Sequence, residues 1–315
     1  MNPIQNIAVI GAGAVGGFYG SKLQKAGYNV QYYSHYLKSS KLKIKSIWGN
    51  YEIPIKVYQN TKEMQPSDLI IVSTKLSPDI NIYKLIYPII KENSIILFLQ
   101  NGINQEEKFY QAIKKDKNIY KLNPVILGGL AFTCINRVSP SEIHHIDYGK
   151  IKIGALLKEH HKIAKEIVAI FQNAGIETEF TLNLRKARWE KLLWNIAFNT
   201  LSVLGNKATT EELIFSPYTE ELATLLMKEI IKIAEYEKNS PGKKLVKEMI
   251  ERTKKMKPYK TSMLIDYENK KPMEIEAIVG EPLHLAKKYK IETPYLKFCY
   301  NLLKFLDEQN RKNIV

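Results

Sequence analysis

The stretch NIAVIGAGAVGG, Asn6–Gly17, decides the fold of this 315-residue chain. Its first five residues form a short apolar run typical of a buried strand, and helical periodicity follows the glycines. Gly11, Gly13 and Gly16 lie between these elements in the pattern G-x-G-x-x-G. There, the first glycine allows a tight turn, the second lets a pyrophosphate approach the backbone, and the third lets helix and strand pack closely. The stretch therefore predicts a dinucleotide-binding βαβ unit. The expected cofactor contacts are Gly11, Ala12, Gly13, Ala14, Val15 and Gly16.

The end of the second predicted strand, Val30–Tyr33, indicates which dinucleotide binds. NAD enzymes usually place an Asp or Glu there to hold the ribose 2′-hydroxyl. This chain has no acid near that point and offers Ser34, His35 and Lys38 instead. Polar and cationic side chains favour a ribose 2′-phosphate, so the pattern predicts NADP. The alternative, that the lysines of this segment are simply solvated, stays open.

Two further apolar runs, Asp68–Ser73 and Ile95–Leu99, are expected to be parallel strands covered on both faces. Lys75 follows the first run and Asn101 follows the second. The carboxyl ends of parallel strands meet at one edge of a sheet, where open α/β folds bind their ligands. We therefore expect Lys75 and Asn101 to converge on a ligand.

The remaining patterns before residue 182 predict two antiparallel pairs, a helix and an edge strand. Lys43–Ile47 and Tyr51–Val57 are expected to form a hairpin through Trp48-Gly49-Asn50. A second pair, Glu142–His145 with Lys152–Ala155, is expected around a turn at Tyr148-Gly149. The helix and the edge strand are expected at His160–Ala174 and Glu177–Phe180.

From Leu182 onward the pattern is almost wholly helical, and prolines mark the breaks. A chain of this length also favours two domains over one core. The prediction is an α/β fold with an N-terminal Rossmann-type dinucleotide-binding domain, residues 1–182. An all-α C-terminal domain, residues 183–315, follows it.

The first helix of that second domain, Arg185–Asn199, carries an unusual stripe. Lys191, Asn195 and Asn199 recur at i, i+4 and i+8 on one face, and every residue between them is apolar. A helix that is apolar nearly all round is normally buried, so its polar side chains need partners or must line a cleft. The alternative is an amphipathic helix with a thin solvent face.

Two polar residues of the second predicted domain, Ser262 and Glu274, do not by themselves indicate a functional site. Ser262 opens a short helical segment and reads most simply as an N-cap. Glu274 reads most simply as an acid in the first turn of a helix, where it complements the helix dipole.

Composition narrows the class of protein. Charged residues make up 25% of the chain, and the net charge of +15 comes from scattered lysines with no basic run interleaved with aromatics. Nucleic-acid binding is therefore not expected, although a basic protein attracts small anions. The two cysteines and six histidines show no metal-binding spacing, and no run reaches the roughly 18 apolar residues of a membrane span. A cytoplasmic protein without a metal or a membrane partner is expected.

The chain resembles the ketopantoate reductase (2-dehydropantoate 2-reductase) family. The motifs that carry the resemblance run in order from Asn6 to about Gly280. They are Gly11–Gly16, Thr74-Lys75, Asn101-Gly102, Trp189-Glu190-Lys191-Leu192 with Asn195 and Asn199, Ser262-Met263-Leu264-Ile265-Asp266, and Glu274-Ile275. The lysine and asparagine stripe together with the Ser262 segment is more specific to this family than the glycine motif.

The resemblance implies NADPH-dependent reduction of ketopantoate to pantoate in pantothenate synthesis. It makes Lys191 the general acid and places Glu274 and Ser262 in the substrate site. Asn195 and Asn199 would position the substrate, while Lys75 and Asn101 would lie where cofactor and substrate meet. One departure stands out, because His35 takes the place where the family often has an arginine for the 2′-phosphate.

Two other functions stay open at this point. The chain could be an NADP-dependent reductase of another 2-keto or β-hydroxy acid, or a dinucleotide-binding regulator without turnover. The regulator is disfavoured because a pure binder needs the glycine loop but not Lys191 with Glu274. A homodimer through apolar helices such as Tyr295–Leu306 is a further possibility.

Overall fold

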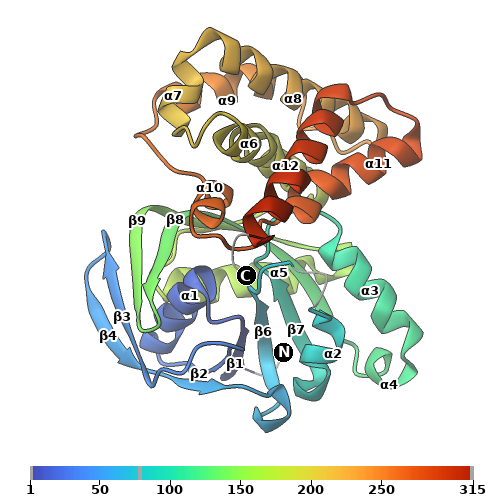
Figure 1. The fold of residues 1–315 in the computed structure, drawn as a ribbon. Coiled ribbons are helices and arrows are strands. Elements are labelled where there is room, and N and C mark those ends of the chain that lie inside the picture. The colour runs from blue at the N-terminus through green and yellow to red at the C-terminus, as the bar shows by residue number, and fades with distance from the viewer. Residues whose placement is uncertain (1–2, 77–79, 313–315) are drawn as a thin grey trace. The chain divides into compact units, whose positions relative to one another are not determined.

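The computed structural model describes residues 3–76 and 80–312 and divides into two compact units. Unit 1 comprises the chain up to Gln100 together with Asn104–Leu184. Unit 2 comprises Arg185–Val315 and a short excursion of the chain, Asn101–Ile103. Figure 1 shows strands of unit 1 in blue and green and the helices of unit 2 in yellow to red.

Unit 1 is built on one ten-stranded sheet in the order β4-β3-β9-β8-β7-β6-β1-β2-β5, with β10 paired to β9 (Figure 1). Neighbouring strands are parallel except for β3 with β4 and β8 with β9. The strands are β1 Asn6–Ile10, β2 Asn29–Tyr33, β3 Lys41–Ser46, β4 Tyr51–Pro54, β5 Lys56–Tyr58, β6 Ser67–Val72, β7 Ile90–Phe98, β8 Val125–Ser139, β9 Glu142–Ala155 and β10 Thr178–Phe180.

Helices cover both faces of this sheet. Ile7 and Val9 of β1 pack in the core cluster that contains α1 (Ala14–Lys25) and α5 (His161–Asn173). Ala8 and Ile10 alternate with them and pack in the opposite cluster, with α2, α3 and α4. Burial on both faces explains why the central strands read as continuous apolar runs. The bounds on that second face are α2 Ile82–Ile86, α3 Gln105–Lys115 and α4 Lys117–Tyr120, and short helical turns lie at Thr61–Glu63, Tyr87–Ile89 and Lys158–His160.

The predicted hairpin through Trp48-Gly49-Asn50 is present but shorter than expected. β3 and β4 pair antiparallel, and β4 ends at Pro54, which pairs with Lys41. Proline has no N–H with which to extend the ladder. The segment after it, β5, pairs parallel with β2, so treating Tyr51–Val57 as one strand was wrong.

The predicted turn at Tyr148-Gly149 was also wrong. β8 and β9 are long continuous strands whose pairing begins beside Pro140-Ser141, with Ser139 opposite Glu142. Tyr148 and Gly149 both have positive φ, 59° and 122°, and they lie at an irregularity within β9 where the register shifts. A β-bulge uses the same left-handed residues as a turn, so the two look alike in sequence.

Unit 2 is helical, and α6 (Leu184–Leu204) supplies the centre of its core (Figure 1). Leu193, Ile196 and Phe198 are each fully buried in that core. The other helices are α7 Thr210–Phe215, α8 Pro217–Tyr236, α9 Lys244–Lys254, α10 Ser262–Glu268, the π-helix η4 Glu276–Gly280, α11 Glu281–Tyr289 and α12 Pro294–Lys312.

The predicted fold class is confirmed: a Rossmann-type α/β unit precedes an all-helical one. The predicted helix at His160–Ala174 is present as α5, and the edge strand at Glu177–Phe180 is present as β10. Across residues 3–76 and 80–312, no helix is long and apolar enough to cross a membrane.

Candidate functional site

The glycine loop between β1 and α1 adopts the conformation that its sequence predicts. Gly11 has φ of 101°, and a Cβ there would lie 2.5 Å from the backbone nitrogen of Thr74. A Cβ at Gly16 would lie 2.2 Å from Ser73 Oγ and 2.3 Å from the Gly11 carbonyl oxygen. The first glycine therefore permits the turn, and the third brings α1 against the ends of β1 and β6.

Gly13 differs from Gly11 and Gly16, because no described residue lies close enough to exclude a side chain at this position. A Cβ at Gly13 would meet no described heavy atom within 4 Å. Gly13 is also the N-cap of α1, and among the described residues no side chain caps this end and no acid lies in its first turn. The first N–H groups of a helix lack partners within the helix and favour an anion. The loop thus offers open space and uncapped N–H donors, which fit a pyrophosphate.

The end of β2 carries the residues predicted to choose the cofactor. Ser34 Oγ accepts a hydrogen bond of 3.0 Å from the Leu37 N–H, so Ser34 shapes the turn. His35 and Lys38 are exposed, and the His35 ring packs edge-on to Tyr36. Within Ser34–Lys38 no carboxylate competes for a phosphate.

Lys75 and Asn101 belong to different units. Lys75 is exposed just beyond β6 in unit 1. The preceding Thr74 accepts hydrogen bonds from Gln100 Nε2, at 2.8 Å to its carbonyl oxygen and 3.0 Å to its hydroxyl. Gln100 thereby ties the ends of β6 and β7 together, whereas Asn101 begins the excursion into unit 2.

Lys191 lies on α6 and donates a 2.8 Å hydrogen bond to Asn101 Oδ1. Burial lowers the pKa of Lys191 to about 7, and repulsion by Arg188 adds to the effect. The Glu274 carboxylate acts in the opposite direction and raises this pKa. A lysine in this range exchanges a proton near neutral pH, as a general acid must.

Asn195 and Asn199 follow Lys191 on α6 and are only 8% and 2% exposed. Among the residues that the structure describes, neither side-chain amide makes a hydrogen bond. Neither amide is among the fully buried polar atoms that lack a hydrogen-bond partner, so both amide groups reach accessible space, where a ligand could bond to them.

Ser262 is the first residue of α10 and is exposed. The prediction that it caps this helix was wrong, because the N-cap is Thr261, whose hydroxyl accepts from the Leu264 N–H. Thr261 is fully buried and shares a 2.6 Å hydrogen bond with Ser202 of α6. Ser202 in turn donates to the Asn199 carbonyl oxygen. With its hydroxyl not used as the cap, Ser262 can contact a ligand.

Glu274 is half-buried and lies two residues before the π-helix η4. Its carbonyl oxygen accepts from the Ile278 N–H. The π-helix is anchored by Glu276, which accepts from the Tyr300 hydroxyl at 2.8 Å and from Lys304 Nζ at 3.0 Å. Single π-turns are frequent at functional sites.

Sequence reasoning missed Arg188, which is 2% exposed and lies three positions before Lys191 on the same helix. Residues at i and i+3 face the same side, so this spacing could have identified Arg188 as a charge that acts on Lys191.

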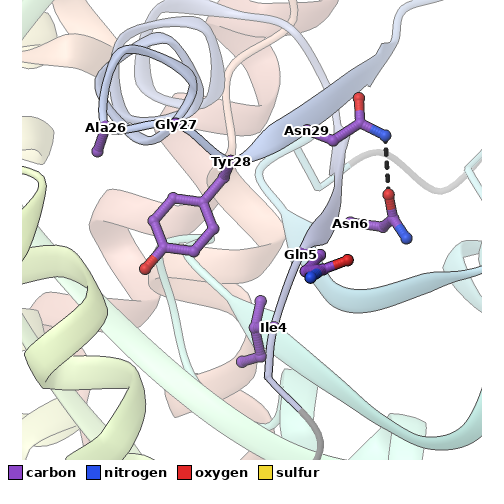
Figure 2. Close-up of a pocket in the computed structure, with 7 residues that line it drawn as sticks. All are labelled: Ile4, Gln5, Asn6, Ala26, Gly27, Tyr28 and Asn29. Carbon is purple, nitrogen blue, oxygen red and sulfur yellow. Dashed lines mark hydrogen bonds between the residues drawn. The ribbon is translucent and has the colours of Figure 1, made fainter.

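A cavity of about 430 Å³ lies at the amino ends of β1 and β2 (Figure 2). Its lining includes Asn6 and Asn29, whose side chains share a 2.7 Å hydrogen bond. None of its described lining residues carries a charge. It is at the opposite end of the strands from the glycine loop, so it is not part of the candidate site.

Comparisons with known proteins point to one family. Residues 7–158 match the family model described as "Ketopantoate reductase PanE/ApbA", and residues 183–307 match the model of its C-terminal part. The chain is similar to a protein of Nostoc sp. named 2-dehydropantoate 2-reductase, with 38% identity over 96% of each chain.

Solved structures agree on the fold. A 2-dehydropantoate 2-reductase from Geobacter metallireducens has a TM-score of 0.87 and 34% identity, and the match covers 96% of this chain and 99% of that one. A D-mandelate dehydrogenase solved with NADH and anilino(oxo)acetate has a TM-score of 0.85 over 97% and 99% of the two chains. At 23% identity, this second likeness shows the fold alone.

Proposed function

The chain belongs to the ketopantoate reductase family, and on that premise we propose that it reduces 2-dehydropantoate to pantoate with NADPH, in the synthesis of pantothenate and coenzyme A. The protein is an oxidoreductase that uses a nicotinamide dinucleotide. The observation that carries the proposal is Lys191, a half-buried lysine with a pKa of about 7. Its helix also carries Asn195 and Asn199, which are 8% and 2% exposed and whose amides make no hydrogen bond within the described part of the chain.

We assign the cofactor to residues 1–182, where the glycine loop fits a dinucleotide. Support comes from the open space at Gly13 and the uncapped N-terminus of α1. Ser34, His35 and Lys38 would contact the ribose 2′-phosphate, and Lys75 would add a positive charge nearby. The absence of an acid from Ser34–Lys38 favours NADPH over NADH.

We assign the substrate and the proton to residues 183–315 with Asn101. When bound, the reduced nicotinamide supplies the hydride that attacks the carbonyl carbon of the keto acid. Lys191 donates a proton to the carbonyl oxygen as negative charge develops there. Asn101 orients the ammonium group by accepting its hydrogen bond, and Glu274 favours its charged form.

The remaining polar groups hold the keto acid. Asn195 and Asn199 can bond its polar oxygens without adding charge, and the exposed Ser262 hydroxyl offers a further donor. This leaves Lys191 and Glu274 as the catalytic pair, and Asn101, Asn195, Asn199 and Ser262 as the substrate contacts.

The test follows NADPH absorbance with 2-dehydropantoate and a panel of other 2-keto acids, with NADH in parallel. Lys191→Ala should lower kcat by about 10²- to 10⁴-fold while NADPH still binds. Lys186→Ala is the matched control, because Lys186 is exposed on the same helix. Unchanged turnover in Lys191→Ala would remove Lys191 from the mechanism. If NADPH is oxidised only with another keto acid, that acid is the substrate in place of 2-dehydropantoate. If no keto acid causes oxidation of NADPH or NADH, the chain is a dinucleotide-binding regulator.

We also propose a homodimer through α12. Its exposed apolar side chains, Tyr295, Phe298, Leu302 and Phe305, follow a spacing of three, four and three residues. This is the spacing of a coiled-coil seam, which a second copy of the same helix complements. Phe298→Glu with Phe305→Glu should convert a dimer to a monomer in light scattering, whereas Tyr218→Glu, also exposed and apolar, should not. A monomeric wild type contradicts the proposal.

A further inference from the structure

Arg137, on β8, is a charged side chain that donates hydrogen bonds to the backbone of the glycine loop. Its Nη2 donates to the carbonyl oxygens of Ala12 and Gly13, the latter at 3.2 Å. Its Nη1 donates to the Pro140 carbonyl oxygen at 2.7 Å. One guanidinium thus joins the loop to the end of its own strand.

The charge of Arg137 is not neutralised locally. Among the described residues no carboxylate pairs with it, and its buried Nε has no hydrogen-bond partner. Burial lowers the pKa of Arg137 to about 10, so the group stays charged at neutral pH. A half-buried cation bonded only to carbonyl oxygens lacks the anion that normally accompanies it.

Gly17, the second glycine of the pair that ends the motif, makes room for this side chain. G-x-G-x-x-G does not require a glycine there, yet a Cβ at Gly17 would lie 2.8 Å from Arg137 Nη2 and 2.6 Å from Ile143 Cδ1. Both neighbours are ends of side chains. The close approach of Arg137 therefore explains why a second glycine, Gly17, follows Gly16, which the G-x-G-x-x-G motif alone does not require.

The guanidinium also lies at the wrong end of a helix for a cation. Gly13 is the N-cap of α1, and its carbonyl oxygen accepts from both Arg137 and the Gly17 N–H. The N-terminus of a helix carries partial positive charge, so a cation there is unfavourable until an anion binds. The same arrangement strengthens an anion site.

We propose that Arg137 is a positioning residue of the dinucleotide site, which holds the carbonyl groups of Ala12 and Gly13 and supplies positive charge that the cofactor pyrophosphate balances. The proposal rests on the proposed function only in taking a nicotinamide dinucleotide as the ligand. Holding the carbonyl groups from the β8 side fixes the peptide planes of the loop. The charge acts on any ligand with a pyrophosphate, with or without a 2′-phosphate.

Dissociation constants for NADPH and NADH, measured by calorimetry on the full chain, test this. Arg137→Met should raise the dissociation constants of NADPH and NADH by the same factor, about tenfold or more, because the positive charge and its charge-assisted hydrogen bonds are lost together. Arg137→Lys should recover part of the affinity, since it keeps the charge but not the planar fork. At saturating NADPH, kcat should change little. Arg252→Met, an exposed arginine of α9, is the matched control.

A double-mutant cycle with Gly17→Ala adds a second readout. Gly17→Ala alone should weaken the binding of NADPH, because the new Cβ displaces the Arg137 guanidinium. In the Arg137→Met background, the same substitution should weaken NADPH binding much less. Unchanged dinucleotide affinity in folded Arg137→Met would overturn the assignment, as would a loss confined to NADPH or an equal fall in kcat.

If Arg137→Met does not fold, Arg137→Lys carries the test, and wild-type affinity in that variant contradicts the proposal. Binding is measured without substrate, so a wild type that binds NADPH but reduces no keto acid refutes the proposed function and leaves the test of Arg137 intact.

Discussion

Lys191 sets the pH dependence expected for this protein. Its pKa is lowered to about 7, and a general acid works only while protonated. The rate of reduction should therefore be highest below pH 7 and fall as pH rises through the pKa of Lys191.

Two neighbouring charges, on Glu274 and Arg188, should move the pH at which the rate falls in opposite directions. Glu274 raises the pKa of Lys191, so Glu274→Gln should shift the fall in kcat/KM to lower pH. Arg188 lowers the same pKa, so Arg188→Gln should shift the fall to higher pH. The measurement is the pH profile of kcat/KM for both variants. Shifts of the same sign would mean that these charges do not act on Lys191 as described.

At this scale the sequence predicted the polar stripe but not all of its partners. Periodicity alone aligned Lys191 with Asn195 and Asn199, because all three lie on one helix. The bond from Lys191 to Asn101 spans 90 positions, so no local pattern predicts it. The N-cap of α10 was misassigned because Thr261 and Ser262 carry the same local signal, and only the distant Ser202 distinguishes them.

At the scale of elements, the start of α10 depends on the buried hydroxyl pair of Thr261 and Ser202. Thr261→Val should cost about 1–2 kcal/mol of unfolding free energy, because a helix cap and a buried hydrogen bond are lost. It should also raise KM for the keto acid, since Ser262 is the next residue.

Thr209→Val is the control for this prediction. Thr209 caps α7 through a capping box and is not among the proposed substrate contacts. It should lower stability to a similar extent and leave KM unchanged. If both variants raise KM equally, the effect of Thr261 is general loosening of the helical unit.

Elements with a clear period were predictable, and elements interrupted by special residues were not. β1, β6 and α5 follow apolar patterns that burial imposes along their whole length. β9 contains Tyr148 and Gly149 at positive φ, and its continuity depends on pairing with β8, which sequence does not show. Pro54 ends β4, whereas the apolar pattern predicted that this strand would continue to Val57.

At the scale of the whole molecule, the chain passes between its units more often than two consecutive domains would need. Asn101–Ile103 belongs to the helical unit although unit 1 flanks it on both sides. Ile103 is 1% exposed in the core of unit 2, and Asn101 accepts from Lys191.

Ile103→Ala should therefore destabilise the helical unit by about 2–4 kcal/mol, as deletion of a buried isoleucine does. In a Trp48→Phe background, tryptophan fluorescence reports only Trp189 and Trp194, both in unit 2. Urea unfolding followed by this signal should shift for Ile103→Ala. The control Ile113→Ala empties an equally buried site in unit 1 and should shift it less. Equal shifts would mean that the two units unfold together.

The excursion at Asn101–Ile103 also limits how such a protein can be recombined. A single crossover near residue 184 would deliver a foreign helical half without its own tripeptide, so the residues at 101–103 that meet its lysine and its core would come from the other parent. A chimera that takes the whole helical unit from one parent needs two exchanges, one for 101–103 and one for 185–315. Gene shuffling at one junction therefore mixes two parents within the core of the helical unit, whereas point substitution within that unit leaves its two segments matched.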